Sequence, residues 1–317
     1  MPPDANALGR EFNTAIIEGI SRLAWDHPSQ PPPVGAQYEW QAVDHCMEFV
    51  EQDGMRVQAH HLAWGRPEVI PPWLLGGGYS DEETIAILRE HVRTVVGRLR
   101  GRVHRWSAVT EPFESDGSYK TGPDRWRWWN DNSPWSDGID PDYIEVVFRE
   151  AHATDPKAIL LLNDWDIEFI NPRSDAVYNL VARLKQKEVP IHGVGMQMHL
   201  PVAWGFPDTA TLAANMRRFK DDLGMPVYIT EMSVDASGLG ATRDERFAVQ
   251  AEIYRSVFQA AVESGTCRDV CIFGVSDNET NVFESDEESN EFLFDDDYQR
   301  KPAYFALREE LSKLPDM

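Results

Sequence analysis

Short apolar segments alternate with amphipathic segments along most of this 317-residue chain. Several of the apolar segments are continuous runs, as expected for parallel strands that are covered on both faces. Repeated strand–helix units of this kind predict an α/β fold built on a parallel sheet. The pattern predicts seven strands, at about residues 12–18, 56–64, 103–110, 158–164, 192–198, 226–231 and 270–276.

The segments between the predicted strands carry helix start and stop signals. Ser80-Asp-Glu-Glu83 and Thr242-Arg-Asp-Glu245 are capping boxes, each expected to open a helix. Gly101 is predicted to end the first of these helices. Asp140-Pro141 supplies an N-cap and a first-turn proline, and Ser174 is predicted to start a further helix.

The chain has the length of one α/β barrel without a second domain. No linker, low-complexity tract or sequence repeat interrupts the strand–helix pattern. We therefore predict a single domain over residues 1–317, with residues 1–11 as a short N-terminal extension and residues 12–317 as the barrel.

The charge of the chain limits its partners. There are 53 acidic and 30 basic side chains, a formal net charge of −23, which repels phosphate backbones and anionic lipids. We therefore expect no nucleic-acid partner. We also expect no membrane partner, since no apolar run approaches the roughly 20 residues that span a bilayer. A neutral substrate suits this surface better.

Targeting and cysteine signals are sparse. The N-terminus has no basic and apolar leader pattern, so this chain is expected to be cytoplasmic or a mature secreted form. Cys46, Cys267 and Cys271 are too few and too unevenly spaced for a disulfide framework, and we interpret them as packing residues.

Ionisable, amide and indole side chains recur where the predicted strands end. In a parallel barrel, the carboxyl ends of the strands form the face that carries the active site. Glu111 and Glu231 each close an apolar run, and a pair of carboxylates across one barrel mouth is what glycosidic-bond hydrolysis requires. The strand-end residues are His60, Trp64, Glu111, Asn163, Asp164, Trp165, Gln197, His199, Glu231 and Asp277.

A loop between residues 124 and 135 is rich in tryptophan. Its Pro, Asn and Asp content predicts a loop, and loops seldom hold so much aromatic surface without a purpose. It follows the strand that ends at Glu111, so we favour a substrate-facing wall over a packed lid. Its tryptophans are Trp126, Trp128, Trp129 and Trp135.

Six segments occur in the order found in one enzyme family. They are Trp106–Phe113, Leu161–Glu168, Gly193–Leu200, Val227–Glu231, Phe273–Asp277 and Leu293–Tyr304. Together they resemble the family-10 glycoside hydrolases, the retaining endo-β-1,4-xylanases and their relatives, from about Phe12 to the C-terminus. The resemblance implies a TIM-type (β/α)8 barrel, a carbohydrate substrate and no cofactor or metal.

The resemblance also implies residue roles. Glu111 corresponds to the general acid/base and Glu231 to the nucleophile, which predicts a gap of roughly 5–5.5 Å between their carboxyl groups. His199 is expected to orient Glu231. Residues expected to read sugar hydroxyls are Gln197, Asn163 and His60, and aromatic residues expected to bind substrate are Trp25, Trp64, Trp165, Phe273, Trp126, Trp128 and Trp129.

Several positions depart from the family pattern. The Asn before the acid/base is Thr110, and the Asp two residues after the nucleophile is Ser233. Other departures are Ala24 for Lys, Gly65 for His and Phe273 for Trp. The sequence therefore predicts hydrolysis of a β-linked, xylan-like saccharide, with a carbohydrate-binding pseudoenzyme as the alternative.

Two further expectations concern assembly and metals. The family's first strand and helix have no counterpart here, since about ten residues precede the first predicted strand. Either the chain is truncated, or the barrel is incomplete and another element, such as a second subunit of a homo-oligomer, covers the gap. A metal-dependent hydrolase would need a ligand cluster, and His60 and His61 are expected to point to opposite faces of their strand.

Overall fold

The structure, a computed structural model, describes residues 5–20, 38–65, 70–75, 78–120, 143–206, 208–239, 242–278 and 290–314. These residues divide into two compact units, and each is described by itself. The N-terminal unit comprises Ala5–Asp164 and Asp175–Gly193, and the C-terminal unit comprises Trp165–Ser174 and the chain from Val194 onward. The single-domain assignment stays a prediction.

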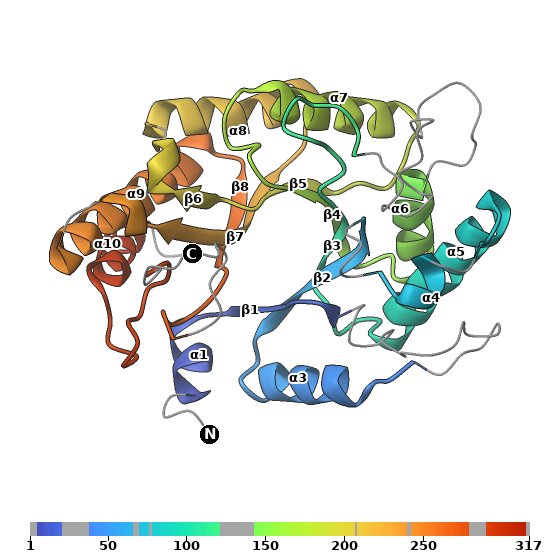
Figure 1. The fold of residues 1–317 in the computed structure, drawn as a ribbon, viewed down its shortest axis with the longest axis horizontal. Coiled ribbons are helices and arrows are strands. Elements are labelled where there is room, and N and C mark those ends of the chain that lie inside the picture. The colour runs from blue at the N-terminus through green and yellow to red at the C-terminus, as the bar shows by residue number, and fades with distance from the viewer. Residues whose placement is uncertain are drawn as a thin grey trace. The chain divides into compact units, whose positions relative to one another are not determined.

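The N-terminal unit is built on four parallel strands. β1 (Thr14–Ile17), β2 (Arg56–Trp64), β3 (Arg105–Thr110) and β4 (Ile159–Asp164) pair in chain order (Figure 1). Most of their residues are buried on both faces, as the continuous apolar runs predict. The register pairs Trp64 with Thr110 and Thr110 with Asn163, so these three strand ends lie at one edge of the sheet.

Helices flank these strands along the chain of this unit. They are α1 (Ala5–Glu11), α3 (Gln41–Gln52), α4 (Pro72–Leu75), α5 (Asp81–Arg98), α6 (Tyr143–Thr154) and α7 (Pro172–Gln186), the last of which begins in the C-terminal unit. The predicted capping box of α5 is confirmed, with Glu83 N donating to Ser80 Oγ and Ser80 N donating to a Glu83 carboxylate oxygen. α5 ends at Arg98, three residues before Gly101, whose φ of 75° lies in the turn that follows.

β7 (Val227–Asp235) is the central strand of the C-terminal unit. Its first half pairs in parallel with β5 (Gly193–Met196), and its second half pairs in parallel with β6 (His199–Pro201). β8 (Cys267–Ile272) pairs in parallel with the other side of β7. Glu231 therefore lies at the point on β7 where its partner changes from β5 to β6.

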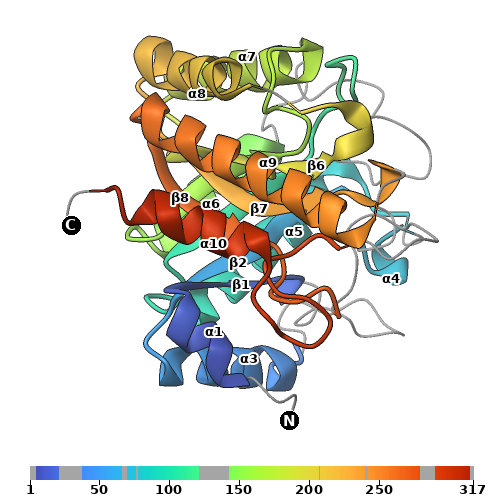
Figure 2. The same cartoon turned by 90° about the vertical axis from the view of Figure 1, so that its left-hand side faces the viewer.

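Helices α8 (Thr209–Leu223), α9 (Arg243–Ser264) and α10 (Pro302–Leu311) complete the C-terminal unit, with the 3-10 turns η3 (Val202–Trp204) and η4 (Ser237–Leu239). α9 packs against both α8 and α10, and Figure 2 shows α10 lying alongside it. The capping box predicted at Thr242 is confirmed, because Glu245 N donates to the Thr242 hydroxyl and Thr242 N donates to the Glu245 carboxylate.

Each of the seven predicted strands has a counterpart among the described residues. The largest differences concern β7 and β8, and β8 also ends at Ile272 rather than near residue 276. β7 continues four residues past Glu231, because β6, a strand that the sequence did not predict, pairs with its second half. β8 begins at Cys267 rather than near residue 270, because pairing with β7 includes its polar first residues.

One predicted helix start is also wrong. α7 begins at Pro172, and Ser174 N donates to the Asn171 side chain at 2.8 Å, so Asn171 is the capping residue. The Ser174 hydroxyl instead contacts the Ile167 carbonyl at 3.2 Å. The start signal Asp140-Pro141 lies outside the described residues.

The cysteines and the lengths of the described helices bear on two further sequence expectations. All three cysteines carry free thiols, as predicted. Among the described helices, none combines the length and the apolar character needed to cross a membrane. The homo-oligomer that would complete the barrel stays a prediction.

Candidate active site

Glu111 stands directly after β3, and its backbone is held in an uncommon conformation. Its φ of 52° lies in the left-handed region, which non-glycine residues seldom adopt and which clusters at functional sites. Its N–H donates to the Asn163 carbonyl at 2.9 Å, so the neighbouring strand β4 fixes its position. The residue is buried, as predicted for a strand-end carboxylate with a partner.

Lys120 is that partner. Its Nζ lies 3.0 Å from Oε2 of Glu111, and the two side chains are 9% and 11% exposed. A short hairpin returns the chain: Phe113 pairs with Tyr119, Lys120 N donates to the Pro112 carbonyl, and Gly117 turns with a φ of 82°. Sequence reasoning missed Lys120, although the Asp116-Gly117 turn signal predicts a chain reversal at this point.

His60 belongs to a buried polar chain on β2 and β3. Arg105 Nε, which can only donate, contacts Gln58 Oε1 at 2.6 Å. The Gln58 amide nitrogen therefore donates to His60 Nε2, also at 2.6 Å, and a neutral His60 carries its proton on Nδ1. These two hydrogen bonds, from Arg105 to Gln58 and from Gln58 to His60, fix the orientation of the His60 ring.

The expectation that His60 and His61 point to opposite faces is wrong. Their ring centroids lie 5.0 Å apart, and the peptide bond between them is cis. The pairing of β2 with β3 shifts register between His60 and Ala63, so strict alternation of side chains does not hold there. The His61 ring also lies 4.6 Å from that of Trp64, at the end of β2.

The structure thus brings three predicted site residues to one edge of the N-terminal unit. Trp64 is half-buried, Asn163 is fully buried, and Glu111 follows the strand between them. Thr110 is fully buried as well, and its hydroxyl has no hydrogen-bond partner within the described part of the protein.

Glu231 is the centre of the second group, in the C-terminal unit. It is 4% exposed, and its N–H donates to the Gln197 carbonyl at 3.1 Å. His199 Nε2 lies 3.2 Å from Oε2 of Glu231, as predicted, and His199 Nδ1 lies 2.9 Å from the Ser233 hydroxyl. A neutral imidazole satisfies both contacts when Nε2–H donates to Glu231 and the Ser233 hydroxyl donates to Nδ1.

Phe273 lies beside His199 in this group, and its role in substrate binding stays a prediction. Its ring meets that of His199 edge-on, with centroids 5.1 Å apart, and its N–H donates to the Met232 carbonyl. Trp165 has the Arg173 guanidinium 4.3 Å from its ring centroid, so a cation covers part of one ring face. Trp25, Trp126, Trp128 and Trp129 lie outside the described residues, and their roles stay predictions.

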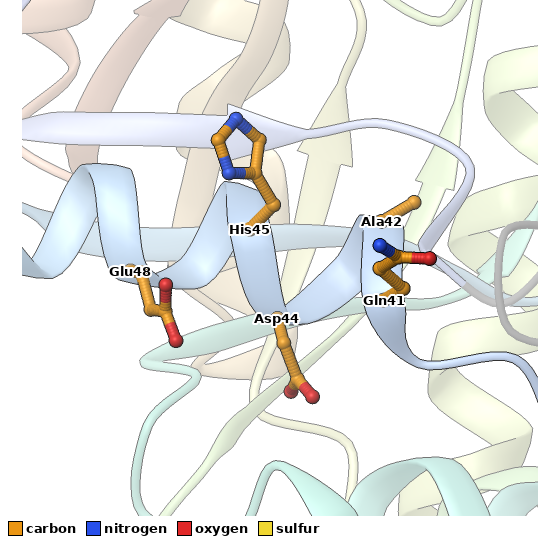
Figure 3. A pocket seen from close by; sticks show the side chains of 5 residues that line it. All are labelled: Gln41, Ala42, Asp44, His45 and Glu48. Atoms are coloured by element: carbon orange, nitrogen blue, oxygen red, sulfur yellow. The ribbon is translucent and has the colours of Figure 1, made fainter.

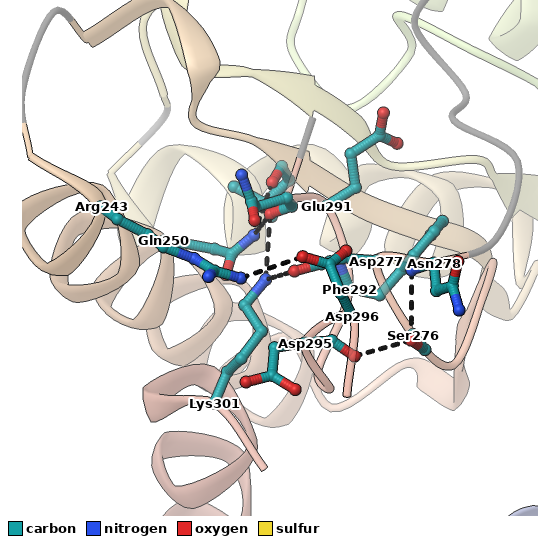
Figure 4. Close-up of polar contacts among 12 residues, drawn as sticks. Arg243, Gln250, Ser276, Asp277, Asn278, Glu291, Phe292, Asp295, Asp296 and Lys301 are labelled. Atoms are coloured by element: carbon teal, nitrogen blue, oxygen red, sulfur yellow. Dashed lines mark hydrogen bonds and ion pairs between the residues drawn. The ribbon is translucent and has the colours of Figure 1, made fainter. Parts of the chain in front are cut away.

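Asp277, a strand-end acid in the sequence, lies in a buried ion pair (Figure 4). Lys301 Nζ donates to its Oδ2 at 2.8 Å, and Phe292 N donates to its Oδ1 at 2.9 Å. Burial raises the pKa of Asp277, and the Lys301 ammonium opposes that rise. We therefore assign Asp277 to the support of the fold.

A surface hollow lies on α3, in the N-terminal unit. Exposed or half-buried side chains of one helix line it (Figure 3), and none of them belongs to the predicted site. The lining residues are Gln41, Ala42, Asp44, His45 and Glu48.

Comparison with known proteins decides the family, because residues 3–310 match the model of glycosyl hydrolase family 10. The chain belongs to glycosyl hydrolase family 10. It is 35% identical to endo-1,4-beta-xylanase B of Thermotoga neapolitana, over 95% of this chain and 81% of that protein. It is 30% identical to a beta-1,4-xylanase of Dictyoglomus thermophilum, over 95% of this chain and 83% of that protein.

Solved structures of family-10 members agree with the fold class. Xylanase 10B of Thermotoga petrophila in complex with xylobiose matches with a TM-score of 0.83 and 32% identity, over 98% of this chain and 88% of that one. Native xylanase 10B of Thermotoga maritima matches with a TM-score of 0.84 and 32% identity, over 98% and 89%. The chain is an endo-xylanase-like glycosidase of the TIM-type (β/α)8 barrel class.

Proposed function

We propose that this family-10 protein is a retaining glycoside hydrolase that cleaves β-1,4-linked, xylan-like saccharides. In this proposal Glu231 is the nucleophile and Glu111 is the general acid/base. The observation that carries it is the arrangement around Glu231: a buried carboxylate on a central strand, held by one imidazole that a neighbouring hydroxyl orients in turn.

That arrangement suits a nucleophile. The Nε2–H of His199 directs one oxygen of Glu231 and favours the ionised form, while a neutral ring adds no full positive charge that would weaken the attack. Attack on the anomeric carbon forms a covalent glycosyl-enzyme as the bond to the leaving oxygen breaks.

The surroundings of Glu111 suit a group that must act as acid and then as base. It gives its proton to the leaving oxygen and becomes a carboxylate, which the Lys120 ammonium at 3.0 Å stabilises. The carboxylate then accepts a proton from water as water attacks the glycosyl-enzyme. Glu111 and Glu231 lie in different units, so the gap of roughly 5–5.5 Å that retention requires stays a prediction.

The substrate assignment rests on the relatives. Two similar proteins bear xylanase names, and one of the matching structures contains xylobiose. Trp64 and Trp165, both half-buried, are candidate stacking surfaces, although the Arg173 guanidinium covers part of one Trp165 face. An uncharged pentose chain also suits the net charge of −23.

Stepwise kinetics with aryl xylobiosides test the two roles separately. Glu231→Ala is expected to abolish hydrolysis of every aryl xylobioside, whatever its leaving group, because no nucleophile remains. In Glu111→Ala, formation of the glycosyl-enzyme is expected to remain fast for a substrate that releases nitrophenolate, because this leaving group needs no proton. For a substrate with a poor leaving group, the same step is expected to become too slow to detect. Azide added to Glu111→Ala should give a β-glycosyl azide, the product of a second inversion at the glycosyl-enzyme.

Glu263→Ala, which removes an exposed carboxylate of α9, is the matched control and should behave as the wild type. Full activity in Glu231→Ala contradicts the proposal. Binding of xylo-oligosaccharides without any turnover would favour the pseudoenzyme. Thr110 is the observation behind that second candidate, since a buried hydroxyl stands beside Glu111 where the family pattern has an amide.

A further inference from the structure

Glu168 is a buried acid that the proposed mechanism does not use. It belongs to the C-terminal unit and is 1% exposed. The buried Asn215 side chain donates to its backbone carbonyl at 2.9 Å and to that of Ile167 at 2.7 Å, which fixes the chain at this point. The Glu168 carboxylate accepts a hydrogen bond from the backbone N–H of Met198 at 2.7 Å.

Met198 is the turn between β5 and β6. Its φ of 65° lies in the left-handed region, a conformation that a methionine seldom adopts and that persists only when its surroundings hold it. The Met198 carbonyl accepts from Ser233 N at 3.2 Å. The residue before it, Gln197, accepts from the Glu231 N–H, and the residue after it is His199.

We propose that Glu168 is a positioning residue for the nucleophile: its carboxyl group holds the Met198 turn, and the turn holds His199 against Glu231. The inference rests on the proposed role of Glu231 as the nucleophile. Every contact in it lies within the C-terminal unit.

The protonation of Glu168 gives this contact a measurable signature. Burial raises the pKa of the Glu168 carboxyl to about 7, against the hydrogen bond from Met198. The ionisable groups that act on it are Asp166, which raises the pKa, and His199, which lowers it when its ring is protonated. A protonated carboxyl keeps one oxygen free to accept, so the turn is held in both states, and glutamine imitates the protonated one.

Selective labelling of the full chain with 15N-methionine tests the contact directly. The protein has nine methionines, so the amide spectrum is sparse, and Met198→Leu identifies the Met198 signal. The amide proton of Met198 is expected to shift with pH around 7 in the wild type and to stay constant in Glu168→Gln. A wild-type signal that ignores pH between 5 and 9, or one that titrates equally in Glu168→Gln, overturns the assignment.

Kinetics on a nitrophenyl xylobioside test the positioning. Glu168→Gln retains an acceptor and is expected to keep kcat within a few-fold. Glu168→Leu removes the acceptor and is expected to lower kcat by roughly 10- to 100-fold with little change in KM, since misplacement of a reacting group by about 1 Å costs on that order. A group that only stabilises the fold would leave kcat of the folded fraction unchanged.

The outcomes separate this inference from the proposed function. If Glu231→Ala abolishes turnover but folded Glu168→Leu keeps the wild-type kcat, the positioning role is wrong and the nucleophile stands. If Glu231→Ala retains turnover, the proposed function is wrong. Should Glu168→Leu fail to fold, the Met198 titration and Glu168→Gln still decide whether the carboxyl holds the turn.

Discussion

Lys301→Met should destabilise this protein far more than the loss of an ordinary surface charge. The Lys301 ammonium donates to Asp277 Oδ2 at 2.8 Å and to the Asn290 carbonyl at 3.1 Å, and it lies 4.4 Å from the centroid of the Phe247 ring. The side chains of Lys301 and Asp277 are each 1% exposed. Methionine has a similar length and replaces none of these polar contacts.

The expected loss follows from what remains buried. Without Lys301, Asp277 keeps the Phe292 N–H but has no charge partner, and removing one member of a buried ion pair costs about 3–5 kcal/mol of unfolding free energy. The pair lies in a poorly solvated environment, and this burial lowers the pKa of Lys301. In the double variant Lys301→Met/Asp277→Asn no unpaired charge remains, so it should be more stable than Lys301→Met alone.

The pair also supports the strand that carries the proposed nucleophile. Lys301 holds the Asn290 carbonyl, and the next carbonyl, that of Glu291, accepts from Val234 N at 3.2 Å and from the Tyr254 hydroxyl at 2.8 Å. Val234 lies three residues after Glu231 on β7. Activity of Lys301→Met is therefore expected to decline at a lower temperature than that of the wild type.

Urea unfolding followed by tryptophan fluorescence measures the effect, with 11 tryptophans as probes. Lys313→Met is the matched control, because the Lys313 side chain is 54% exposed in its contacts with α10 carboxylates, and exposed ion pairs contribute little to stability. Equal losses of unfolding free energy in Lys301→Met and Lys313→Met would refute the reasoning. The single variant Asp277→Asn completes the cycle: if the loss in Lys301→Met/Asp277→Asn equals the sum of the losses in Lys301→Met and Asp277→Asn, the two side chains are not coupled and the reasoning fails.

Three further outcomes are expected. Lys120→Met removes a cation 3.0 Å from Glu111 that favours the ionised carboxylate, so the alkaline limb of kcat/KM should move to higher pH; an unmoved limb contradicts this. The pKa of Glu168 rises from 4.5 to about 7 on folding, so the folded state keeps a proton that the unfolded state loses. Stability should therefore fall by roughly 3 kcal/mol as pH rises through that window, and Glu168→Gln should flatten the slope in pH-dependent urea unfolding. Ser80→Ala removes the side chain that caps α5 and should cost about 1 kcal/mol in the same unfolding assay, with no change in activity at 25 °C; a cost below a few tenths would argue against the cap.

Local signals in the sequence were sufficient for the elements that depend on near neighbours. The capping boxes at Ser80 and Thr242 each join groups three residues apart, so the helix starts could be predicted without the rest of the fold. Asn171 and Ser174 are both good capping residues, and the sequence favoured the wrong one because only the path of the chain decides between them.

Strand ends depend on partners and were less predictable. The apolar run before Glu231 indicates a strand, but β7 extends to Asp235 because β6 pairs with it, and the three-residue β6 has no periodic signal of its own. His60 and His61 were misplaced for a similar reason, since the register shift against β3 is a property of the paired strands.

The sequence by itself determined the strand–helix order, the family and the two strand-end glutamates, because these depend on local patterns and on ordered motifs. Only the tertiary structure decided what each glutamate contacts. Lys120 reaches Glu111 through a hairpin, and His199 reaches Glu231 from the first position of the neighbouring strand β6, directly after a turn that Glu168 holds. These contacts join residues that are nine to 32 positions apart in the sequence. Which side chains at such a separation come into contact depends on how the strands and loops pack, and no local pattern records that.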